Sequence, residues 1–153
     1  MAVNIEKNVK LDKFKFKTTG KVRFHEVDAF KVVHNLQYFY WTEVSRVDYC
    51  NFLNIGVVPV SKESPDFSVF LVHSEIDYYK PATFLDDYFV HTRVKRIGNS
   101  SIEFEHVITN TKDEILAIHR AIEVYVDRHK VATIVPDDIR RKIIEFENNN
   151  IEL

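Results

Sequence analysis

The chain has 153 residues, of which 45% are hydrophobic and 29% are charged, and its formal net charge is −2. This length and composition are typical of one globular domain that buries a core of its own. The charge argues against a nucleic-acid-binding protein, because neutralising phosphates requires a clear surplus of basic residues. A single cysteine, Cys50, excludes an internal disulfide and fits a reducing compartment.

The N-terminal residues do not have the pattern of a targeting signal. Residues 1–13 alternate charged side chains with isolated apolar ones and contain no apolar core. No apolar run in the chain approaches the roughly 18 residues that a membrane-spanning helix needs. We therefore expect a cytoplasmic protein with no integral membrane segment.

Residues 14–28 show the spacing-two pattern of a β-strand. Phenylalanine and valine alternate with polar residues in both halves of the segment. Gly20 lies between the halves and predicts a bend or a break. The strand is expected to end at the carboxylate of Asp28, and a short apolar loop leads from there into a helix.

Residues 35–53 have helical spacing. One apolar stripe consists of Leu36, Tyr40, Val44 and Val47. Further aromatic side chains surround this stripe, so we expect a helix that is buried on most sides. Asn35 is a suitable N-cap, and Gly56 lies just past the expected end.

The rest of the chain predicts a loop, consecutive strands and a final helix. Two prolines mark residues 57–67 as a loop that can gate a pocket. Strand-like runs follow at 68–80, 88–97, 102–109 and 114–127, and 131–135 is a short last strand or an extended tail. Pro136, at the first helical position, opens a helix that ends near residue 147. This order predicts an α+β fold in which antiparallel strands curl around the long helix.

Two separated segments carry a recognisable pattern. The first consists of Val22-Arg23-Phe24 through Asp28, then Val32-Val33-His34, Tyr38 and Glu43-Val44-Ser45-Arg46. The second consists of Ile76-Asp77-Tyr78-Tyr79-Lys80-Pro81-Ala82, Asp87, and Thr92 through Ser101. In this order they resemble the hotdog-fold acyl-CoA thioesterases, specifically the 4-hydroxybenzoyl-CoA thioesterase group that includes the Tol–Pal-cluster thioesterase. The resemblance covers about residues 17–135.

The resemblance implies a hotdog fold of the α+β class, with an antiparallel sheet wrapped around a long central helix and a short C-terminal helix. We expect a single domain over residues 1–153, with its core at about 14–135 and the last helix at about 136–147. The resemblance also implies a homodimer or homotetramer with its active site at the subunit interface. Exposed sheet edges, which dimerisation extends, give a physical reason for this assembly.

Three positions depart from the family pattern. Val27 stands where a small threonine or cysteine usually precedes the acid, and Asn35 stands where an aromatic residue or histidine is common. Lys31 stands where glycine is usual, so the loop either has ordinary dihedral angles or accepts strain that glycine would avoid. These departures bear on substrate preference and, to a lesser extent, on catalytic competence.

Asp28 is the expected catalytic carboxylate. Thioester hydrolysis needs a nucleophile or an activated water, together with donors aimed at the developing oxyanion. The resemblance implies that Asp28 attacks directly or acts as a general base, and that backbone amides near His34 and Asn35 supply the donors. Without the resemblance, Asp28 is more simply a residue that ends a strand or caps a turn. His34 either assists proton transfer and lines the pocket, or forms an ordinary hydrogen bond at a helix start.

Substrate-binding roles are expected for five further residues. Tyr38 matches a family position, and Glu43 either faces the acyl pocket, pairs with Arg46 three residues away, or faces another subunit. Arg93, Lys95 and Arg96 are candidate partners for the phosphates of coenzyme A. The alternative for these three is a solvated strand face. No metal is expected, because nothing resembles the spacing of a known metal motif.

The leading interpretation is an acyl-CoA thioesterase that releases a carboxylic acid and coenzyme A and needs no cofactor, because coenzyme A is part of the substrate. The alternative is a non-catalytic module that binds acyl-CoA or acyl-carrier protein, and Lys31 is its best support. An enoyl-CoA hydratase is a weaker alternative, because it would need Asn-Pro after the acid and a histidine five residues on. His34 lies six residues after Asp28. The acyl group and its carrier, coenzyme A or acyl-carrier protein, stay open.

Overall fold

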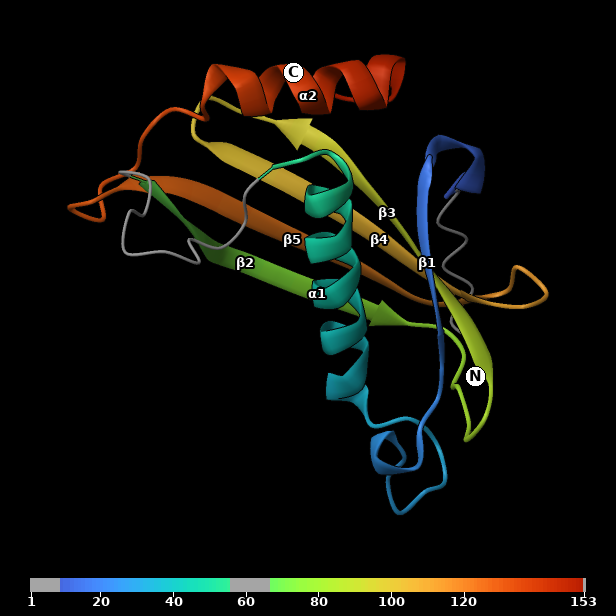
Figure 1. Ribbon diagram of the computed structural model, residues 1–153. Helices are drawn as coiled ribbons and strands as arrows, with labels where there is room; N and C mark the ends of the chain where they lie inside the picture. Colours follow the sequence, from blue (N-terminus) through green and yellow to red (C-terminus); the bar gives the residue numbers. More distant parts are fainter. Residues whose placement is uncertain (1–8, 56–66, 153) are drawn as a thin grey trace.

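One antiparallel sheet and two α-helices, joined by short 3-10 helices and loops, make up the fold in the computed structural model, which describes residues 9–55 and 67–152 (Figure 1). The strands are β1 (Phe16–Lys21), β2 (Phe67–Tyr78), β3 (Asp87–Ile97), β4 (Ser101–Asn110) and β5 (Ile115–Asp127). Their order in the sheet is β1-β3-β4-β5-β2. Helix α1 (Asn35–Phe52) crosses one face of the sheet, and α2 (Asp137–Glu147) lies at one end of it (Figure 1). The predicted α+β class is confirmed.

The first strand ends earlier than its alternation predicts. β1 stops at Lys21, and the chain continues into the 3-10 helix η2 (Phe24–Glu26) rather than into a longer strand. Val22 is fully buried and its amide donates to the Asp86 carbonyl, whereas Phe24 is 82% exposed. The alternation therefore extends past the true strand, and Asp28 does not end it.

Gly20 does not break the strand either. It pairs with Tyr88 of β3 inside the regular register. A Cβ atom at Gly20 would lie 2.2 Å from the Tyr88 ring. A residue with a Cβ atom at this position would therefore have to displace the Tyr88 ring.

The buried face of α1 differs from the predicted apolar stripe. Leu36, Tyr40 and Val44 are all more than half exposed. The buried residues of the helix are Tyr38, Trp41, Thr42, Ser45, Tyr49 and Cys50. Ser45 Oγ on this face lies 2.7 Å from Thr92 Oγ1 of β3, whereas the Thr42 hydroxyl donates to the Phe39 carbonyl of α1 itself (2.9 Å). Both hydroxyl groups can therefore be buried, because each has a hydrogen-bond partner.

The C-terminal segment closes one end of the sheet. Residues 131–135 form an extended tail with a single bridge to β5, and Pro136 is the N-cap of α2 rather than its first residue. Glu147 at the end of α2 is fully buried, and its Oε1 accepts hydrogen bonds from the Tyr49 hydroxyl (2.7 Å) and the Val94 amide (2.9 Å). This carboxyl group therefore joins α2, α1 and β3.

Some expectations fall outside the described residues. Gly56 and the predicted loop lie there, except that Phe67 begins β2. Among the residues that the structure describes, no helix has the length and apolar character needed to cross a membrane.

Candidate functional site

Asp28 lies in a tight turn between η2 and α1. Its amide donates to the Val32 carbonyl (2.9 Å), and its carbonyl accepts from the Lys31 amide (3.0 Å). The carboxylate oxygen Oδ1 accepts a hydrogen bond from the Phe30 amide (2.8 Å). The other oxygen, Oδ2, has no hydrogen-bond donor among the described residues. Asp28 thus caps a turn with one oxygen and leaves the second available for chemistry.

Lys31 has the conformation that glycine favours. Its φ angle is 64°, in the left-handed region where a side chain is strained. The sequence left open whether the loop has ordinary dihedral angles or accepts the strain that glycine would avoid. The φ angle of Lys31 shows that the loop accepts the strain. The turn that glycine would form is therefore retained with lysine in place.

The N-cap of α1 is His34 and not Asn35. His34 Nδ1 accepts a hydrogen bond from the Leu36 amide (3.2 Å), and the His34 amide donates to the Glu26 carbonyl (2.9 Å). The Gln37 amide donates to the His34 carbonyl (2.9 Å). The Asn35 amide has no acceptor among the described residues, and as the first residue of the helix it has none within α1. One free donor thus remains at this helix end.

A pocket of about 260 Å³ lies at the same end of α1. Its lining comprises Val33, Asn35, Tyr38, Tyr78, Tyr79, Lys80 and Pro81. The Tyr78 hydroxyl donates to the Asn35 carbonyl (2.8 Å), and the buried Tyr38 hydroxyl accepts from the Ala82 amide (3.1 Å). Burial raises the pKa of both tyrosines, and the two rings contact each other edge to face at 5.3 Å. Both hydroxyls therefore stay protonated at neutral pH.

The turn and the pocket are held side by side. A bridge joins Val27 to Val33, and the Val33 amide donates to the Ala82 carbonyl (2.9 Å). These contacts bring together the loop of Asp28, the start of α1 and the segment after β2. The sequence patterns alone assign no role to Tyr78. Its place in the second family-like segment is the signal that could have found it.

Glu43 and Arg46 do not pair with each other. Arg46 instead forms a largely buried ion pair with Glu123 of β5 (3.0 Å). Glu43 is exposed and has no ion-pair partner among the described residues. Of the three alternatives for Glu43, pairing with Arg46 does not occur, because β5 offers Arg46 a carboxylate nearer the core.

The structure does not bring the basic residues of β3 together with Asp28. Arg93 is buried, and its guanidinium binds Glu105 through Nε (2.9 Å) and donates to the Asn150 carbonyl (3.1 Å). Its neighbour Thr92 contacts Ser45 of α1, so strand alternation places Arg93 on the opposite face of the sheet. Lys95 lies 3.8 Å from the same Glu105, and Arg96 is exposed. Arg93 is thus already engaged by a carboxylate.

No group of three or more His, Cys, Asp or Glu side chains within residues 9–55 and 67–152 is placed to hold a metal ion. On the outer strand, His73 contacts Glu75 (3.3 Å), and Glu75 also binds Arg120. These side chains therefore form a surface hydrogen-bond network around the Glu75–Arg120 ion pair.

Comparison with known proteins identifies the family. The model of the thioesterase-like superfamily matches residues 22–143. The chain belongs to this superfamily. The match spans both family-like segments. The predicted hotdog fold and the predicted class of enzyme, a thioester hydrolase, are therefore confirmed.

Individual relatives of this superfamily member are distant in sequence. A protein of Aquifex aeolicus (strain VF5) that bears the name "Putative esterase" is 28% identical over 89 residues. These residues are 58% of this chain and 67% of that protein. A 1,4-dihydroxy-2-naphthoyl-CoA thioesterase of Synechocystis has a TM-score of 0.80 at 17% identity, covering 87% of this chain and 98% of that one. A thioesterase of Thermus thermophilus, solved with coenzyme A and zinc, has a TM-score of 0.75 at 25% identity, covering 90% and 98%.

Proposed function

We propose that this superfamily member hydrolyses acyl-CoA thioesters to a free carboxylic acid and coenzyme A. One observation carries the proposal: the free amide at the start of α1 belongs to Asn35, which lines the pocket beside the Asp28 turn. A helix N-terminus with a free N–H stabilises negative charge that develops on a carbonyl oxygen. The CoA-bound relative and the naphthoyl-CoA thioesterase support a thioester of coenzyme A as the substrate class.

The carbonyl oxygen of the thioester accepts a hydrogen bond from the Asn35 amide. This bond polarises the carbonyl group and makes its carbon more electrophilic. Because this donor belongs to the backbone, asparagine replaces the aromatic residue of other family members without loss of the donor. Hydrogen-bond donors of this kind contribute about 10²–10³-fold to turnover in acyl transfer.

Asp28 Oδ2 activates the attack by one of two routes. In the first, the carboxylate adds to the carbonyl carbon, coenzyme A leaves as the thiolate and takes up a proton, and water cleaves the resulting anhydride. In the second, the carboxylate removes a proton from a water molecule that attacks directly. Repeated turnover in ¹⁸O-labelled water separates the routes, because only the first can leave label in the Asp28 carboxyl group.

His34 is proposed to hold the first turn of α1 rather than to transfer a proton. Its Nδ1 atom already accepts the Leu36 amide, and its own amide is bonded to Glu26. Both bonds fix the direction of the peptide that carries the Asn35 donor. Tyr38 and Tyr78 shape the pocket beside it.

The first experiment compares the wild type with Asp28→Asn on a panel of short, long and aromatic acyl-CoAs, with release of the thiol as the readout. Asparagine keeps an oxygen for the Phe30 amide, so the turn is expected to survive. We expect turnover to fall by about 10²–10⁴-fold, the usual range for a general acid or base. Asp12→Asn, an exposed aspartate in the N-terminal 3-10 helix, serves as the matched control.

Near-normal turnover of Asp28→Asn would contradict the role of Asp28. Thioester binding without hydrolysis across the whole panel would instead indicate a binding module. Running the panel again with acylated carrier protein tests the other carrier. The glycine-like conformation of Lys31 weakens the case for the binding module, because the loop keeps its geometry.

A further inference from the structure

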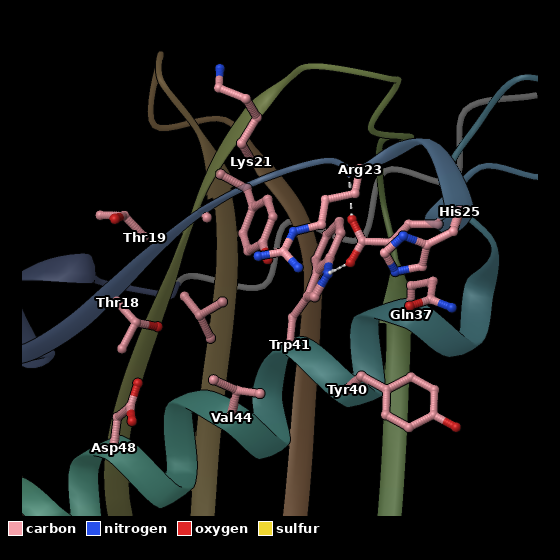
Figure 2. A pocket seen from close by; sticks show the side chains of 14 residues that line it. Thr18, Thr19, Lys21, Arg23, His25, Gln37, Tyr40, Trp41, Val44 and Asp48 are labelled. Atoms are coloured by element: carbon pink, nitrogen blue, oxygen red, sulfur yellow. Dashed lines mark hydrogen bonds between the residues drawn. The ribbon is translucent and has the colours of Figure 1, made fainter.

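A second hollow, of about 410 Å³, lies between β1 and α1 (Figure 2). Residues 18–21 of β1 form one wall, η2 closes one end, and the residues of α1 from Gln37 to Asp48 form the other wall. We call this hollow the β1 groove. Its volume lies within the roughly 300–1,000 Å³ that is common for small-molecule sites.

The β1 groove is separate from the proposed active site. The active-site pocket is lined by the end of β2, and the groove is lined by β1, which lies at the opposite edge of the sheet. The two hollows share no lining residue. Their linings meet where the Trp41 ring of the groove packs against the Tyr38 ring of the active-site pocket, with the ring centres 4.9 Å apart.

One cation in the groove forms no direct ion pair with a described residue. Lys21 is neutralised by Asp87 at 2.7 Å. The buried Glu26 carboxylate is already engaged, because Oε2 accepts the Arg23 amide (2.7 Å) and Oε1 accepts Trp41 Nε1 (2.8 Å). The Arg23 guanidinium has no acceptor among the described residues, and Figure 2 shows its side chain reaching over the groove.

The wall beneath Arg23 is apolar and consists largely of stacked aromatic rings. Trp41 stacks on Tyr88 with the ring centres 3.8 Å apart and an interplanar angle of 14°. The bond from Trp41 Nε1 to Glu26 holds this ring in place, and Tyr88 is fitted over Gly20. Val44 and Val90 extend the apolar surface.

We propose that the β1 groove binds a small monocarboxylate with an apolar body. The Arg23 guanidinium pairs with the carboxylate, whose two oxygens match its planar fork. The apolar body lies against Trp41, Tyr88 and the valines. A dianionic phosphate is disfavoured relative to a monocarboxylate, because one guanidinium balances one negative charge and the Glu26 and Asp48 carboxylates in the lining repel a dianion more strongly than a monoanion. This site goes beyond the proposed hydrolysis and does not depend on it.

Trp41 is the sole tryptophan of the chain, so intrinsic fluorescence reports on the wall of this groove. The wild type is titrated with hexanoate, with the neutral isostere hexanamide, and with inorganic phosphate. We expect a saturable change with hexanoate alone. Arg23→Gln should weaken the binding of hexanoate by about tenfold or more, as loss of a charged hydrogen-bonded contact does. Arg141→Gln, an exposed arginine on α2, should leave it unchanged.

Tyr78→Phe separates the two hollows, because Tyr78 lines only the active-site pocket. Hexanoate binding that survives Tyr78→Phe and is lost in Arg23→Gln supports the proposal, with circular dichroism verifying the fold of each variant. Loss in Tyr78→Phe but not in Arg23→Gln would place the acid in the active-site pocket and overturn it. Equal binding of hexanamide or phosphate, or no saturable change, would also overturn it.

Discussion

A single backbone angle decides how the Asp28 turn keeps its shape. Lys31 has a φ of 64°, and the hydrogen bonds on both sides of it hold the turn closed. A left-handed residue other than glycine costs about 1–2 kcal/mol. The surrounding bonds outweigh that cost, so the loop geometry does not require glycine.

At this position Lys31→Val should lower the free energy of unfolding by about 1–2 kcal/mol, because a β-branched side chain fits the left-handed region poorly. Lys31→Gly should change it by less than about 1 kcal/mol, because relief of strain offsets the added freedom of the unfolded chain. Urea denaturation of both variants measures the difference. Equal stability of the valine and glycine variants would mean that Lys31 does not have this conformation in solution.

At the scale of elements, a chain of polar side chains joins α1 to the sheet beneath it. Thr92 Oγ1 lies 2.7 Å from Ser45 Oγ and 2.9 Å from His106 Nδ1. The His106 ring stacks on His119 at 5.3 Å, and His119 Nε2 lies 2.8 Å from Ser74 Oγ. Burial, followed by the nearby Arg46 charge, lowers the pKa of His119 to about 4. Burial likewise lowers the pKa of His106.

These histidines should make the fold sensitive to acid. A histidine with a lowered pKa binds its proton more readily in the unfolded chain, so stability falls as the pH drops from about 6.5 towards 4. For His119 the full loss is on the order of 3 kcal/mol. Thermal unfolding of the wild type and of His119→Gln across this pH range tests this prediction. The variant should lose less stability on acidification, and parallel curves would contradict the assignment.

At the scale of the whole molecule, the two edges of the sheet are unlike. β1 is a short edge of 6 residues, whereas β2 presents 12 residues and carries the exposed side chains of Phe70, Leu71 and Val72. A long apolar edge strand is a template for pairing with another chain. The homodimer predicted from the family resemblance is therefore expected to form along β2.

Val72→Lys should convert the dimer to a monomer, because a charge on the edge strand opposes pairing. Ile134→Lys is the matched control, since both side chains are 60% exposed and Ile134 lies outside the sheet. Sedimentation velocity measures both variants beside the wild type. A wild type that sediments at the monomer mass, or a dimer that persists in Val72→Lys, would rule out this interface.

The sequence by itself determined the class of fold and the family. Those features depend on local periodicity and on short motifs, which survive in the order of the residues. The sequence did not predict which face of α1 is buried, because Ser45 is buried only where Thr92 supplies a hydrogen bond. Likewise, Arg93 looks free along a strand and is engaged only because Glu105 lies opposite on β4. The sequence did not predict the β1 groove either, because its walls come from segments that meet only after folding. Long-range contacts of this kind leave no periodic signal in the chain.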